Sequence, residues 1–149
     1  MSKRLLLGGV LAGVFMLAGC GDGVSMMDVK GTVNFAGSPL PYGEIEFIPN
    51  TTLENSGPAG TAEIVDGKFD TSNGGQGVVP GSQKIRITGY EARPVANEDE
   101  TKTVEQKPPL FVAYLIEMDV DGSDIVLDVP AEAKGFNSYA EPKKARNDP

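Results

Sequence analysis

Apolar and polar side chains alternate in several short segments in the middle of the chain. Residues 29–35 alternate in this way, and residues 44–48 place Ile45 and Phe47 between glutamates. A period of two residues is typical of a β-strand that buries one face. We therefore expect two strands here, with Ile45 and Phe47 facing the core and the glutamates facing solvent.

The strongest turn signal is the pair Asp66-Gly67, which lies between the alternating runs 61–65 and 68–71. Asp-Gly pairs supply the two positive φ angles that a tight type I′ turn requires. The sequence therefore predicts a β-hairpin that turns at Asp66 and Gly67.

Further strands are predicted at 83–90 and 125–129, and residues 110–120 return to an apolar composition before a turn at 121–123. The intervening segments are rich in glycine, proline and polar residues, so we expect loops at 50–60, 72–77 and 91–109. About seven short strands, separated by frequent turns and without a helical period, favour an all-β fold. The predicted architecture is a single antiparallel β-sandwich.

The N-terminal segment has a different pattern, in which Lys3 and Arg4 precede an uncharged run over residues 5–18. This length falls within the ~7–15 residues of a signal-peptide core. It is shorter than the ~20 residues of a helix that spans a bilayer. The segment therefore predicts a signal helix for export rather than a permanent membrane anchor.

The uncharged run ends at the only cysteine of the chain. The tetrapeptide Leu17-Ala18-Gly19-Cys20 resembles the bacterial lipobox. This resemblance implies that the Cys20 sulfur receives a diacylglycerol, that cleavage makes Cys20 the mature N-terminus, and that fatty acyl chains such as palmitate hold the protein in the membrane. Gly21 follows instead of aspartate, which by analogy favours the outer membrane if the source has two membranes. A secretory signal with an incidental cysteine is the alternative.

These patterns divide the chain into four parts. Residues 1–19 form the signal peptide, and residues 20–27 are small and predict a flexible tether. One β-domain occupies 28–130. Residues 131–149 are polar and contain little to bury, so they predict a disordered tail.

Composition restricts the chemistry. The chain has 13 Lys and Arg against 21 Asp and Glu, a formal net charge of −8, and no histidine. Such an acidic protein repels phosphate backbones, so we expect no nucleic-acid partner. Without histidine, the common serine and cysteine triads and most catalytic zinc sites are excluded. We therefore expect no cofactor and no enzymatic activity, with a carboxylate-dependent enzyme as the alternative.

The densest acidic cluster is Asp119, Asp121 and Asp124, with Asp128 nearby, around Gly122. Alternating carboxylates beside a turn can gather oxygen ligands for Ca²⁺, but the terminal glutamate of an EF-hand loop is missing. A solvated turn explains the same residues. Calcium binding is the weaker interpretation, and we assign no metal.

Other surface features carry little specific chemistry. The acidic run 97–100 is interpreted as a solvated connection, with a recognition loop as the alternative. Carbohydrate binding is disfavoured because the chain has no tryptophan, and Tyr42, Tyr90 and Tyr114 are weaker stacking platforms. The cations of 143–146 are too few for a nucleic-acid patch and balance the acidic domain.

Five turn and strand segments carry a family pattern: 29–33, 37–43, 45–49, 66–69 and 79–85. Together they resemble carboxypeptidase regulatory-like domains of the transthyretin (prealbumin) type. The resemblance covers residues 29–90 well and the remainder to 129 loosely, and the layout is similar to small exported lipoproteins of planctomycete-type bacteria.

The resemblance implies a prealbumin-like sandwich of the kind that serves as a folded spacer or binding module. One related branch hydrolyses hydroxyisourate with catalytic histidines, which this chain lacks. We therefore expect a membrane-attached module that contacts another envelope protein or polymer.

Overall fold

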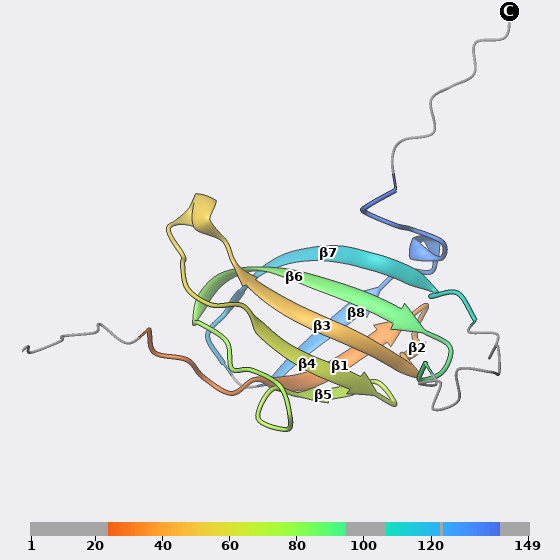
Figure 1. The fold of residues 1–149 in the computed structure, drawn as a ribbon, viewed down its shortest axis with the longest axis horizontal. Helices are drawn as coiled ribbons and strands as arrows, with labels where there is room; N and C mark the ends of the chain where they lie inside the picture. Colours follow the sequence, from red (N-terminus) through yellow and green to blue (C-terminus); the bar gives the residue numbers. More distant parts are fainter. Residues whose placement is uncertain (1–23, 95–106, 123, 141–149) are drawn as a thin grey trace, which may run out of the picture.

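The computed structural model describes residues 24–94, 107–122 and 124–140, and this part of the chain is all-β (Figure 1). The all-β prediction is therefore confirmed. The signal segment, the lipobox residues and Cys20 lie outside the described residues. The strands are β1 (Lys30–Phe35), β2 (Ser38–Pro39), β3 (Tyr42–Pro49), β4 (Gly60–Val65), β5 (Lys68–Asp70), β6 (Gly81–Tyr90), β7 (Phe111–Val120) and β8 (Asp124–Val129), and the 3₁₀-helices are η1 (Thr51–Leu53) and η2 (Ala131–Ala133).

The strands form one continuous sheet of eight strands in place of two separate hydrogen-bonded layers. The order is β2-β1-β5-β4-β3-β6-β7, and β8 pairs with β1. All pairs are antiparallel except β1–β8, which is parallel. β7 ends at Val120 and β8 begins at Asp124, although these strands lie at opposite edges of the sheet. The sheet is strongly curled, as a half-barrel, which brings the end of β7 close to the start of β8 (Figure 1).

The concave inner face of the curled sheet contains the hydrophobic core. Ile45 and Phe47 are buried as predicted, and the ring of Phe47 lies 5.8 Å from that of Phe69. Alternation produces this core in a curled sheet as readily as in a sandwich, because both bury one face of each strand. The largest fully buried apolar side chains are Val29, Val33, Leu40, Ile45, Phe47, Ile64, Val78, Ile85, Ile87, Phe111 and Val120.

The turn between β4 and β5 has the predicted backbone conformation. Asp66 has a φ of 49° and Gly67 a φ of 72°, so both central residues are left-handed as a type I′ turn requires. The predicted hairpin is confirmed.

Both boundaries of the β-domain lie further out than predicted. Met27, assigned to the tether, exchanges two backbone hydrogen bonds of 2.8 Å with Val78. Residues 131–140, assigned to the tail, are also structured: the Val112 amide donates to the Phe136 carbonyl at 2.8 Å, and Ala133 is buried. Within this segment, residues 135–138 lie along the free edge of β7. Residues 141–149 lie outside the described part.

Candidate functional site

The outer face of β3, β4 and β6 carries three glutamates, Glu44, Glu46 and Glu63. Register places Glu44 opposite Glu63 on one side and Thr88 on the other, and places Glu46 opposite Arg86. We call this surface the acidic face. It encloses a hollow of about 440 Å³ that is lined by Glu44, Ile45, Glu46, Thr61, Ala62, Glu63, Gly74, Gly75, Arg86, Thr88 and Tyr139.

One side of the hollow is closed by an ion pair and an aromatic ring. Arg86 Nη1 lies 3.1 Å from Glu46 Oε2, and both side chains are about one third exposed. The guanidinium of Arg86 also lies 5.8 Å from the ring centroid of Tyr139. Tyr139 of the C-terminal segment therefore forms one wall of the hollow. A disordered tail would not have contributed to it.

On the other side of the hollow, the lining residue Glu63 is held by Tyr42. Its hydroxyl donates a 2.8 Å hydrogen bond to Glu63 Oε1, and Arg93 pairs with the second carboxylate oxygen of Glu63. Arg93 also lies over the Tyr42 ring, 5.2 Å from its centroid. The ring of Tyr90 follows at 6.0 Å. These contacts hold Glu63 in place and attach the chain beyond β6 to the sheet.

Both tyrosines are neutral phenols at physiological pH, because the pKa of each is raised. Burial raises the pKa of Tyr42 above its ordinary value, and the hydrogen bond to Glu63 raises it further. Burial also raises the pKa of Tyr90, together with the negative charge of Glu44. The carboxylate of Glu44 forms no ion pair with the other described residues. It is therefore the acidic side chain of this face that stays available to an incoming group.

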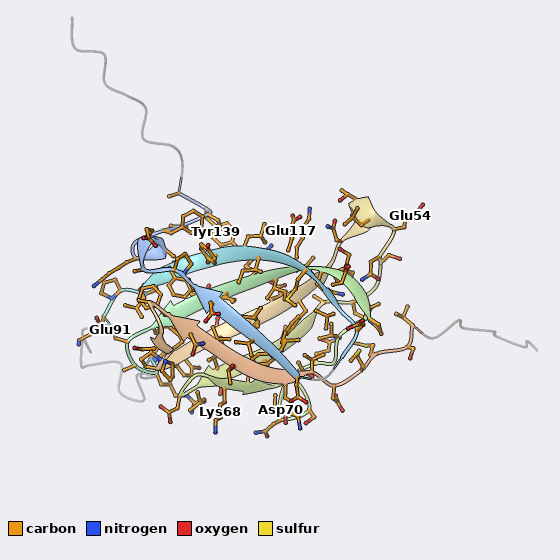
Figure 2. The ribbon with its side chains drawn as sticks, turned by 180° about the vertical axis from the view of Figure 1, so that it is seen from behind. Glu54, Lys68, Asp70, Glu91, Glu117 and Tyr139 are labelled. Carbon is orange, nitrogen blue, oxygen red and sulfur yellow. The ribbon has the colours of Figure 1, made fainter. Side chains whose placement is uncertain are left out.

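A second hollow, of about 470 Å³, lies on the outer surface around β1, β4 and β5. Its charges alternate in sign, because Lys30 stands opposite Asp70 and Asp124. Lys68 and Asp70 project from β5 to the outside (Figure 2). The side chain and backbone amide of Ser72 donate to Asp70 and hold the pKa of its carboxyl below the usual range. The lining of this hollow therefore mixes charges of both signs: Glu63, Asp70 and Asp124 with Lys30 and Lys68.

The aspartates predicted as a weak calcium site are not gathered into one. Asp119, Asp121 and Asp124 are exposed around the β7–β8 turn, and Asp128 accepts a 2.8 Å hydrogen bond from Asn34. Within the described ranges there is no group of three or more side chains that could hold a metal ion.

The remaining predicted residues separate into two groups. Tyr42 and Tyr90 are neighbours on the acidic face, whereas Tyr114 packs edge-on against Phe111 and Phe136. The acidic run 97–100, the cations of 143–146 and the lipidation site Cys20 lie outside the described residues. No helix in the described part is both long enough and apolar enough to cross a bilayer.

Comparisons with protein-family models, curated proteins and solved structures found no match to this chain. The functional argument therefore rests on the residues and contacts above. Sequence reasoning placed Glu44 and Glu46 on the outside of β3, but it did not show that Glu63 stands opposite Glu44 or that Arg86 pairs with Glu46. It also missed the pairing of Arg93 with Glu63. Alternation assigned a face to the clearly alternating strands, and no local signal gave the register between β3 and β4.

Proposed function

We propose that the chain is a lipid-anchored protein of the cell envelope whose β-domain is a non-catalytic binding module. The acidic face is its contact surface, and the partner is an envelope protein or polymer that presents positively charged groups. The observation that carries this proposal is the direct opposition of Glu44 and Glu63 in a hollow bordered by Tyr139. A cation that enters the hollow relieves the repulsion between the two carboxylates.

The arrangement suits binding because its polar groups are already held in position. Glu63 is fixed by Tyr42 and Arg93, and Glu46 by Arg86. A preorganised surface loses little side-chain entropy when it binds. Glu44 is left to make a new ion pair with the partner.

The membrane attachment rests on the lipobox-like residues Leu17 to Cys20. Acyl chains contribute about 0.8 kcal/mol per buried methylene, and more than one chain gives stable anchoring. Gly21 in place of aspartate supports the outer membrane in a cell with two membranes.

We also propose a prealbumin-like ancestry for the β-domain. The turn positions that carry the resemblance have the backbone conformation for which glycine is suited: Gly37 has a φ of 78° and Gly81 a φ of 107°. These angles support the proposal because the motif specifies backbone shape.

Lipidation is tested by metabolic labelling with a palmitate analogue in a bacterium that processes lipoproteins. The wild-type chain should incorporate the label and float with membranes, and Cys20→Ser should do neither. Equal labelling of both chains contradicts the assignment of Cys20.

The contact surface is tested by affinity capture of the lipidated chain from membranes in mild detergent. Glu44→Gln should release the partner that wild-type protein retains. Glu117→Gln is the matched control, because Glu117 is an exposed acid on β7 opposite Lys84 and outside the hollow. Capture of the same proteins by all three chains, or of none, contradicts the binding function of this face.

A carboxylate-dependent hydrolase is the second candidate, because Glu44 and Glu63 both line one hollow. Pairs of carboxylates on either side of a bond hydrolyse glycosides. The test is release of reducing ends from cell-wall polymers by wild-type protein and by Glu63→Gln. Equal release by both, or no release by either, rejects this candidate.

A further inference from the structure

Three exposed apolar side chains belong to two segments that lie at the same end of the β-domain, the first described N-terminal residues and η1. Val24 is 49% exposed, Met26 37% and Leu53 63%. Leu53 belongs to η1, which projects at the same end of the sheet as the first described N-terminal residues in both views (Figures 1 and 2). We call this end, with Val24, Met26 and Leu53, the tether end.

The N-terminal segment is packed onto the domain at this end. Met27 is hydrogen-bonded to Val78 in both directions, at 2.8 Å. Val24 lies beside Gly57: a Cβ atom at Gly57 would lie 3.2 Å from Cγ1 of Val24. The domain therefore continues, as a packed structure, to within four residues of Cys20.

This connection is too short for the domain to move far from an anchored lipid. Four residues span at most about 14 Å even when fully extended. The headgroup layer of one leaflet is itself about 5–7 Å thick. A chain acylated at Cys20 thus keeps Val24 and Met26 at the bilayer surface.

We propose that the tether end rests on the bilayer, with Leu53, Val24 and Met26 inserted at the level of the lipid headgroups. This inference depends on the proposed lipidation of Cys20. Burial of these exposed side chains in the interface adds a second attachment to the acyl chains and fixes the orientation of the domain. The acidic face then stands upright beside the membrane, where a partner can approach it from the side.

The charges of this end select the kind of lipid. Glu54 follows Leu53 at the tip of η1, and Asp28 follows Met27. Both are exposed carboxylates that anionic headgroups repel at low salt. The lipid surface on which the tether end rests is therefore zwitterionic, such as a mixture of phosphatidylethanolamine and phosphatidylcholine.

The test uses a single tryptophan, since the natural chain has none. Lipidated full-length Leu53→Trp is reconstituted into phosphatidylcholine–phosphatidylethanolamine vesicles that contain lipids brominated near the headgroup. Tyr139→Trp is the control, because Tyr139 is 66% exposed and lies away from Glu54 (Figure 2). Insertion by about 5–10 Å should quench the Leu53→Trp emission about two-fold and shift it to the blue. The Tyr139→Trp emission should not change.

The outcomes separate this inference from the proposed function. If the chain floats with vesicles but its Leu53→Trp emission is not quenched, or is quenched no more than that of Tyr139→Trp, the resting orientation is wrong and the lipid anchor stands. If the purified chain carries no lipid and does not float, the proposed function itself fails. Addition of anionic phosphatidylglycerol should weaken the quenching at low salt, and higher salt should restore it.

Discussion

Glu44 of β3 and Glu63 of β4 stand directly opposite each other on the outer face of the sheet. Like charges in this position destabilise a sheet, because the Cβ atoms of opposed residues are only about 4.5–5.5 Å apart. Glu63 is compensated by Tyr42 and Arg93, whereas Glu44 forms no ion pair in the described part. Repulsion is therefore retained at the point where we propose that a cationic partner binds.

Glu44→Gln should stabilise the free protein. Removal of the like charge raises the free energy of unfolding by about 0.5 kcal/mol. Chemical denaturation at low and high salt measures the gain, which should shrink as salt screens the repulsion. Glu117→Gln should lower the free energy of unfolding, because Glu117 faces Lys84. Destabilisation by Glu44→Gln would mean that Glu44 has a favourable partner in the free protein.

Tyr42→Phe should destabilise the protein by about 1–2 kcal/mol at neutral pH, because it removes a buried donor to a carboxylate. Tyr139→Phe, which changes an exposed hydroxyl, should leave the free energy of unfolding unchanged.

The loss caused by Tyr42→Phe should also depend on alkaline pH. The folded state raises the pKa of Tyr42 above its ordinary 10.0, so it favours the neutral phenol. This stabilisation is complete below pH 10 and is lost as pH rises through the raised pKa. The difference between wild type and Tyr42→Phe should therefore decrease above that pH in urea denaturation. A difference that stays constant would show that the phenol does not titrate with folding.

Gly31→Ala should strongly destabilise the sheet. Gly31 pairs with Ile125 between β1 and β8, and a Cβ at this position would overlap the carbonyl oxygen of Ile125. The strands must separate to admit a methyl group, at a cost of about 3 kcal/mol. Gly122→Ala is the control, because a Cβ there meets no atom within 4 Å. Equal melting temperatures for the two variants would contradict the close β1–β8 pairing.

Truncation after Pro130 should lower the melting temperature of the domain, whereas truncation after Ala140 keeps every described contact. The shorter chain loses the hydrogen bonds that join Gly135 to Leu110 and Phe136 to Val112. It also exposes the ring of Tyr114, against which Phe136 packs edge-on. Loss of these contacts should cost about 2–4 kcal/mol. If both truncated chains melt at the same temperature, residues 131–140 do not support the domain.

Local patterns predicted much of the fold but little of the candidate site. The outward position of Glu44 followed from alternation, and so did the burial of Ile45 and Phe47. The contacts that make the hollow join distant residues: Tyr42 with Glu63, and Arg86 with Tyr139. Arg93 lies in a segment predicted as a loop, and Tyr139 in a segment predicted as a tail. Neither residue has a local signal that indicates its partner.

By itself, the sequence determined which residues face the core in the clearly alternating strands, such as Ile45 and Phe47, and where the chain turns, as at Asp66 and Gly67. Those properties depend on neighbours along the chain, because side chains alternate with a period of two and a type I′ turn needs two positive φ angles. Tertiary structure alone decided that the strands form one curled sheet, that β8 lies parallel to β1, and that Glu44 meets Glu63. Register between distant strands depends on how all the apolar faces pack together, and no short segment contains that information.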